Sequence, residues 1–145
     1  MRRALARIVP VVALTAALTG CGSDAADDAG PERCDVPFTV PDGFEATGGI
    51  EDPYKDRVGV RVDMEADGGR ELHFFAGIPG EFGEGLPLAG SLPVADGGEG
   101  ALLGDDDVWV FVVHGEGCSQ TAVLGSGLDR RDFVGVLREV GAVVE

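Results

Sequence analysis

Strict alternation of apolar and polar residues runs through two neighbouring segments in the middle of the chain. In residues 57–66 valine, methionine and alanine occupy every second position, and in residues 71–78 leucine, phenylalanine, alanine and isoleucine do the same. A period of two is typical of a strand with one buried face. The turn-forming residues Asp67, Gly68 and Gly69 separate the segments, so the pattern predicts a β-hairpin.

The length of the hairpin turn decides which polar side chains lie opposite each other. Because both apolar faces must point the same way, the numbers of paired residues must sum to an even value. A three-residue loop then sets Asp63 opposite His73, whereas a five-residue loop sets Glu65 there instead. In either register we expect an ion pair at the surface and not a catalytic dyad.

Residues 108–113 (VWVFVV) are apolar at every position. Such a run predicts a central strand that is covered on both faces, with Trp109 in the core. The other expected features of this region are an extended edge segment or loop at 35–44, a Gly- and Pro-rich loop at 79–100 with a short strand near 92–94, and strands at 101–103 and 118–124.

The C-terminal segment carries the signals of an amphipathic helix. Asp129 is a suitable N-cap, Asp132 lies in the expected first turn, and Gly141 is a suitable C-cap. Leu128 and Phe133 can form a hydrophobic staple. The apolar side chains that share one helical face are Phe133, Val136, Leu137 and Val140. Sheet and helix together predict an α+β fold over residues 34–145, an antiparallel β-sheet with the C-terminal α-helix packed on one face.

The N-terminus has a different pattern, which is typical of an exported precursor. Residues 1–7 are positively charged, and residues 8–18 form an apolar run that is shorter than the roughly 20 residues needed to span a bilayer. The run leads into Leu18-Thr19-Gly20-Cys21, which resembles the lipobox of bacterial lipoproteins: an aliphatic residue, two small residues and a cysteine.

The resemblance implies that residues 1–20 are a signal peptide and that Cys21 becomes the lipidated N-terminus of the mature protein. Two acyl chains on Cys21 would hold the protein stably at the extracytoplasmic face of the cell membrane, where one chain would be marginal. An ordinary secretory leader that ends near a cysteine is the alternative. Arg2 and Arg3 leave the export route open between the general and the twin-arginine pathways.

Charge distinguishes the leader from the rest of the chain. The net charge is −15, and since the only charged residues of the leader are Arg2, Arg3 and Arg7, the remainder carries −18. Such a strongly acidic body repels nucleic acid, so nucleic-acid partners are not expected. Residues 21–33 are mostly small and acidic and predict a flexible tether, whose ends would lie roughly 20 Å apart as a coil.

The chain has three cysteines. If Cys21 carries lipid, Cys34 and Cys118 remain in a compartment where disulfides persist, so a structural disulfide between them is expected. A metal or redox pair is the alternative, but the sequence has no CxxC motif and no Cys/His cluster.

Candidate catalytic chemistry is sparse. The only imidazoles are His73 and His114, and neither Ser119 nor Ser126 lies in a GxSxG motif. Phosphate-binding glycine loops and the HExxH motif of zinc proteases are also absent from the sequence. No catalytic residue and no cofactor is therefore assigned.

One acidic cluster is a candidate cation site. Asp105, Asp106 and Asp107 are consecutive, and Asp96 or Glu99 could add oxygen ligands for calcium. The spacing of a calcium-binding EF-hand loop is missing, and three acids between strands more simply form a solvated turn.

The function that these features favour is a membrane-anchored envelope lipoprotein whose domain is a non-enzymatic binding or sensing module for an unidentified protein or small molecule. The glycine-rich loop at 77–90, with Phe82, Leu86 and Leu88, is either a binding lip or packing over the core. The alternative function is an envelope hydrolase or an accessory subunit of an envelope enzyme.

Overall fold

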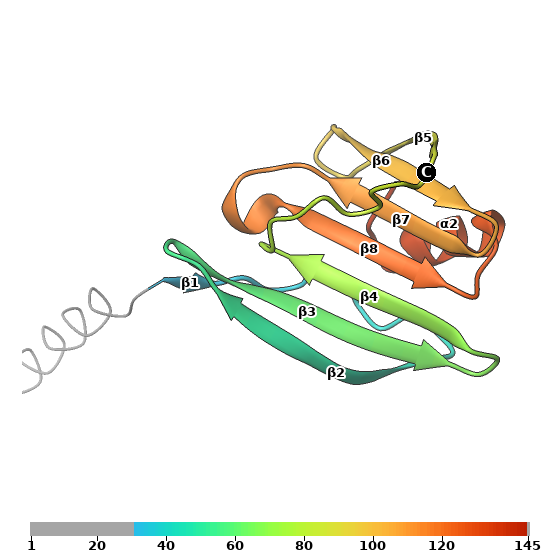
Figure 1. Cartoon of the computed structure of the whole chain (residues 1–145), viewed down its shortest axis with the longest axis horizontal. Coiled ribbons are helices and arrows are strands. Elements are labelled where there is room, and N and C mark those ends of the chain that lie inside the picture. Colours follow the sequence, from blue (N-terminus) through green and yellow to red (C-terminus); the bar gives the residue numbers. More distant parts are fainter. Residues whose placement is uncertain (1–30, 145) are drawn as a thin grey trace, which may run out of the picture. The chain divides into compact units, whose positions relative to one another are not determined.

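An open, eight-stranded β-sheet followed by one α-helix forms the fold in a computed structural model (Figure 1) that describes residues 31–144. The predicted leader, Cys21 and nearly all of the predicted tether lie outside the described residues. The elements in chain order are β1 (Glu32–Arg33), β2 (Phe44–Pro53), β3 (Arg57–Ala66), β4 (Arg70–Ala76), β5 (Leu88–Pro93), β6 (Glu99–Asp105), β7 (Val108–Val113), the 3-10 turn η2 (Gly117–Ser119), β8 (Thr121–Ser126) and α2 (Arg130–Glu139). Within the described residues no helix is long and apolar enough to span a bilayer.

The sheet is mixed, which corrects the expectation of a purely antiparallel sheet. Its order is β1-β3-β4-β8-β7-β6-β5. β2 lies off this path and pairs with the edge of β3 that faces away from β4. All of these pairs are antiparallel except β1 with β3, where Glu32 and Arg33 run parallel to Arg57 and Val58. β1 lies inside the segment predicted as a tether. Both of its residues are exposed and polar, so the sequence has no apolar pattern there that predicts a strand.

The β3–β4 hairpin adopts one of the two registers that the sequence left open. Ala66 lies opposite Arg70, and Asp63 lies opposite His73, as expected for the three-residue loop. Gly68 and Gly69 adopt φ values of 86° and 77° in that loop. Residues other than glycine rarely adopt such φ values, so the two glycines determine the turn, and the turn determines the register.

Strand β2 has no counterpart among the predicted strands. Most of its residues are exposed, and its pairing with β3 is interrupted by a bulge between Ala46 and Gly48. At Gly49 a Cβ atom would overlap the carbonyl oxygen of Arg61 on the neighbouring strand. An exposed edge strand with a bulge and a glycine at a close approach lacks the alternation that marks a half-buried strand.

Strand β7 is the central strand that the apolar run predicts, since it pairs with β6 and β8 and four of its six residues are buried. Trp109 and Phe111 belong to one apolar cluster, which also contains Leu72, Phe74 and Leu102, and in which α2 takes part through Phe133 and Leu137. Val110 and Val112 belong to a second cluster with Ala122. In Figure 1, α2 lies behind β6 and β7.

The helix has the caps that its sequence predicts. Asp129 accepts a hydrogen bond of 2.8 Å from the backbone N–H of Asp132. At the other end Gly141 has a φ of 82°, and the N–H groups of Gly141 and Ala142 donate to the carbonyls of Arg138 and Leu137. These two bonds form a Schellman motif.

Three predicted strands have different bounds in the structure. The short strand expected near 92–94 is β5, which begins earlier, at Leu88, and ends at Pro93. The strand expected at 118–124 is β8, which begins at Thr121, because Cys118 lies in the turn η2. The strand expected at 101–103 is the longer β6, which extends to Asp105 and leaves Asp106 and Asp107 as the turn.

Glycines of β6 make room for the aromatic residues of β7, which gives a test of the core packing. A Cβ atom at Gly104 would overlap the Trp109 ring and lie 2.7 Å from the carbonyl oxygen of Val108. We expect Gly104→Ala to lower the free energy of unfolding by about 1–3 kcal/mol, because the backbone neighbour cannot move aside cheaply. Urea denaturation measures the change.

The matched control is Gly135→Ala in α2, where an added Cβ meets nothing within 4 Å. Alanine is the better helix former, so this variant should gain about 0.5–1 kcal/mol. Equal stabilities for the two variants would contradict the proposed role of Gly104.

Candidate functional site

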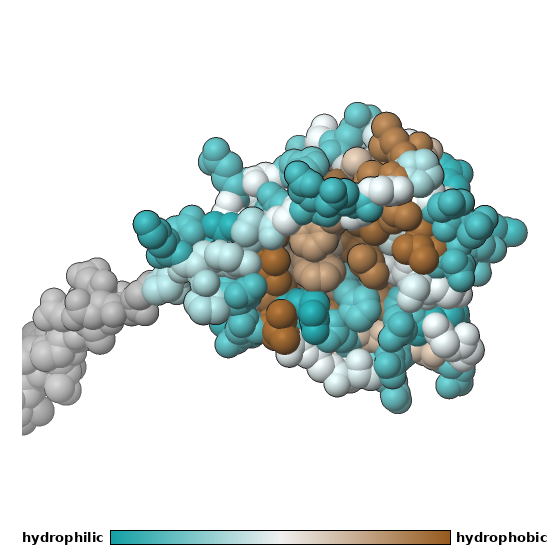
Figure 2. Space-filling view, viewed as in Figure 1, coloured by the Kyte–Doolittle hydropathy of each residue, from teal (hydrophilic) through white to brown (hydrophobic). Residues whose placement is uncertain are grey.

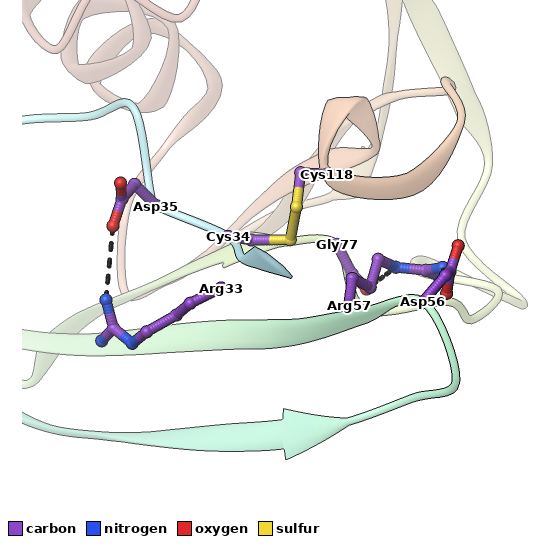
Figure 3. The surroundings of a disulfide bond; sticks show 7 residues. All are labelled: Arg33, Cys34, Asp35, Asp56, Arg57, Gly77 and Cys118. Atoms are coloured by element: carbon purple, nitrogen blue, oxygen red, sulfur yellow. Dashed lines mark hydrogen bonds and ion pairs between the residues drawn. A yellow bond between two sulfur atoms is a disulfide. The ribbon is translucent and has the colours of Figure 1, made fainter. Parts of the chain in front are cut away.

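A disulfide fixes the point where the chain enters the sheet (Figure 3). Cys34 directly follows β1, Cys118 lies in the turn before β8, and their Cα atoms are 5.3 Å apart across a sequence separation of 84. Cys34 is only 1% exposed. The pairing expected from the cysteine count is thus present in the structure.

Gly77 makes the close approach at this disulfide possible. It has a φ of 71°, and a Cβ atom there would overlap Sγ of Cys34. The Arg57 guanidinium donates from Nε to the carbonyl oxygen of Gly77 at 2.7 Å and forms an ion pair with Asp56 (Figure 3). The pairing of β4 with β3 ends at Ala76, opposite Val60, and β1 pairs with the next part of β3, Arg57 and Val58.

The polar cluster on β3 and β4 consists of Arg61, Asp63 and His73. Nδ1 of His73 lies 2.6 Å from Oδ1 of Asp63, and Nη2 of Arg61 donates to Oδ2 of Asp63 at 3.1 Å. Nε of Arg61 lies 2.9 Å from Oδ1 without hydrogen-bond geometry, so that contact is an ion pair alone. The expected pair is present, although Asp63 and His73 are partly buried, with side chains 19% and 29% exposed.

The pKa of Asp63 reflects two opposing influences. Burial alone would raise the pKa of this carboxyl group, but the hydrogen bonds from His73 and Arg61 and the charges of both groups outweigh burial and lower the pKa below its usual value. The carboxylate is therefore held ionised by two donors, which is the environment of a structural ion pair.

Ser126 is the hydroxyl that the strand register brings nearest to this imidazole on the same face. Leu124 of β8 lies opposite His73, and Ser126 lies opposite Glu71, so Ser126 is a diagonal neighbour of His73. Diagonal Cα atoms are about 7–8 Å apart in antiparallel sheets. Within residues 31–144 neither Ser126 nor any other hydroxyl donates to His73, so the cluster lacks the nucleophile–base contact of a hydrolase. His114 and Ser119 lie in or near the turn before β8, away from this cluster.

The candidate cation residues are divided between the two ends of β6: Glu99 begins this strand and Asp96 precedes it, whereas Asp106 and Asp107 form the turn at the other end. Asp105 ends β6, and Asp106 has a φ of 52° at the tip of the β6–β7 hairpin. The carbonyl of Asp106 accepts from Nε1 of Trp109, and that of Asp107 accepts from the N–H of Gly127. In residues 31–144 no group of three or more His, Cys, Asp or Glu side chains has the geometry to hold a metal ion.

The glycine-rich loop mainly packs on the sheet. The Phe82 ring lies 4.8 Å from the Phe75 ring, centroid to centroid, and both residues pack with Leu86 against the second apolar cluster. Leu88 at the start of β5 is different, since it is 72% exposed. Figure 2 shows hydrophobic side chains on this face that are interrupted by polar ones.

An arginine-lined hollow lies between β5 and α2, and sequence reasoning missed it. It has a volume of about 380 Å³ and is lined by Leu92, Arg130, Arg131, Val134 and Arg138, which we call the arginine hollow. Residues 130, 134 and 138 follow one another at intervals of four, a spacing that places them along one stripe of a helix. That spacing was a usable signal, but only the structure brings Leu92 beside it.

Other hollows lie elsewhere on the domain, and the two with the largest volumes among them differ in character. An acidic hollow of about 510 Å³ is lined by Glu45, Glu65 and Asp67 together with backbone and side chains of β2 and β3. A more apolar hollow of about 390 Å³ lies beside Cys118 and includes Phe38, Val94 and Val113.

Removal of the disulfide should destabilise the domain strongly. The double variant Cys34→Ser/Cys118→Ser should lose about 3–5 kcal/mol of the free energy of unfolding, because the reduced chain regains the entropy of a long open loop. Urea denaturation of the wild type with and without reductant should give the same difference. Unchanged stability on reduction would contradict this prediction.

The ion pair of Asp63 predicts a pH-dependent stability. Since folding lowers the pKa of Asp63, the stabilisation is present above the ordinary value of about 3.9 and is lost as the pH falls through the folded-state value. Asp63→Asn should therefore cost about 1–2 kcal/mol at pH 7, and the cost should shrink below about pH 4. Denaturation at several pH values tests this, with the exposed Glu81→Gln as a control that should show no such dependence.

Comparison with known proteins adds no relative: no protein-family model, curated protein or solved structure matches the chain.

Proposed function

We propose that the protein is a lipoprotein, anchored through Cys21 at the extracytoplasmic face of the cell membrane, whose domain is a non-enzymatic binding module. The observation that carries this proposal is the disulfide between Cys34 and Cys118. Disulfides persist in exported proteins and are rare in the cytosol. The bridge uses two of the chain's three cysteines, and the third, Cys21, ends the lipobox-like tetrad.

The proposed layout follows from the same observations. Residues 1–20 are the signal peptide, the tether follows Cys21, and the domain begins with β1 at Glu32. On this proposal α2 covers one face of the sheet. Its support is that Phe133, Val134 and Leu137 are buried in one cluster with residues of β4, β6, β7 and β8, and that a Cβ atom at Gly125 of β8 would lie 2.7 Å from the Phe133 ring.

The binding role is supported by the surface between β5 and α2. A sheet that is covered on both sides of β7 gives a rigid scaffold, and its surface carries the arginine hollow, whose charges have no partner within the described residues. Charged groups that are not used inside a fold are available to a ligand.

Membrane fractionation and intact mass test the anchor. The wild-type chain, produced in a bacterium that processes lipoproteins, should partition into the detergent phase with the added mass of a diacylglyceryl group. Cys21→Ala should lose both properties, whereas Cys34→Ser/Cys118→Ser should keep the added mass because the lipid site is unaffected. A soluble wild-type product without lipid would overturn the proposal.

The second candidate, an envelope hydrolase, is favoured by one observation, the contact between Asp63 and Nδ1 of His73, which resembles the acid–base half of a catalytic triad. A fluorophosphonate reagent discriminates between the two. The binding module should remain unlabelled, whereas labelling that disappears in Ser126→Ala would favour the hydrolase and overturn the non-enzymatic assignment.

A further inference from the structure

We propose that the arginine hollow binds a short acidic peptide segment of a partner protein, one with carboxylates on either side of an aliphatic side chain. This inference rests on the proposed binding function and names its ligand. The argument uses the charge of the hollow, its place on the helix and its apolar lining.

Positive charge is scarce in this molecule and is concentrated at the hollow. The chain has a net charge of −15, and of its 11 lysines and arginines only eight remain once Arg2, Arg3 and Arg7 of the leader are excluded. Three of these eight line the one hollow. Of the other five, Arg33, Arg57 and Arg61 each form an ion pair and Arg70 lies over the Phe44 ring. The fifth, Lys55, is exposed in the turn between β2 and β3.

The three arginines of the hollow behave differently. Arg130, Arg131 and Arg138 are exposed, and within residues 31–144 none of them forms a side-chain hydrogen bond or an ion pair. One acid at each end of the helix is occupied elsewhere: Asp129 caps the N-terminus, and Glu139, the last residue of α2, accepts from the backbone N–H of Asp42. The guanidinium groups are therefore free to bind an external anion.

Helix stability does not account for two of these arginines. Arg130 and Arg131 are the first two residues of α2, at the end where the helix dipole is positive. Cations are unfavourable at this end of a helix. A bound carboxylate would relieve the repulsion between the two side chains and the dipole.

The lining of the hollow selects the class of anion. Leu92 and Val134 line the hollow together with the arginines, and Val134 is only 8% exposed. Nη2 of Arg130 approaches β5 at Gly90, where it lies 4.0 Å from the position that a Cβ atom would take. Arginine pairs with carboxylates through two parallel hydrogen bonds, while the two apolar lining residues offer a contact for an aliphatic side chain.

Larger polyanions fit the molecule less well than a short peptide does. An anionic bilayer or a long phosphate polymer would extend beyond the hollow over a surface that is strongly negative, whereas a short segment contacts the hollow alone. A second copy of this chain could offer its acidic hollow, but each copy carries the same large negative charge, which opposes association.

Fluorescence polarisation with defined peptides tests the proposal on the complete lipidated protein in detergent. The probe is a fluorescein-labelled peptide of alternating glutamate and leucine, and its control replaces glutamate by glutamine. The glutamate peptide should bind and the glutamine peptide should not. The triple variant R130Q/R131Q/R138Q should weaken binding by at least about tenfold, because charge-assisted hydrogen bonds are lost. Lys55→Gln, which changes one exposed charge elsewhere, should leave binding within about twofold.

Circular dichroism of the triple variant checks that α2 remains folded. The proposal is overturned if the folded triple variant binds the glutamate peptide like the wild type, or if the wild type does not distinguish the two peptides. It is also overturned if tripolyphosphate or vesicles of phosphatidylglycerol bind at the arginines and the peptide does not, or if sedimentation shows an arginine-dependent dimer that blocks the peptide. Membrane fractionation of the same variants reports on the anchor independently, so loss of peptide binding with intact anchoring refutes only this ligand assignment.

Discussion

The bridge between Cys34 and Cys118 is the constraint on which the start of the fold depends. β1 is two residues long, exposed and parallel to β3, and a parallel pair of this length has few hydrogen bonds to hold it. The disulfide joins it covalently to the turn before β8, and Gly77 leaves the space that the Cys34 side chain fills. β1 is thus placed by the bridge and by the N–H of Cys34, which donates to the carbonyl of Val58.

Features set by local chemistry could be predicted from the sequence. A period of two reduced the β3–β4 pairing to two registers, each with a carboxylate opposite His73, and the ends of α2 followed from Asp129 and Gly141. β7 was recognisable because a run that is apolar on both faces must be covered on both faces. In each case the residues that decide the structure are neighbours in the chain.

Features set by distant neighbours could not be predicted in the same way. β2 is an exposed edge whose glycine is required by the backbone of Arg61, and nothing in its own pattern records that contact. The arginine hollow needs Leu92 of the edge strand β5 beside the helix, and these two segments lie far apart in the sequence. The helical spacing of the arginines could be seen in the sequence, but the position of Leu92 beside them, which makes the exposed stripe one side of a hollow, could not.

The same bridge has a mechanical consequence under the proposed anchoring. Force on a tether attached to Cys21 enters the domain through β1, where two residue pairs of a parallel ladder would be its first resistance. The disulfide passes that force from Cys34 to the turn at Cys118 and so to β8, a strand held by hydrogen bonds to both β4 and β7. The load is then shared by strands at the centre of the sheet. Because the disulfide carries the load past β1, the weak pairing of this strand is compatible with a domain that stays folded while it is held at a membrane.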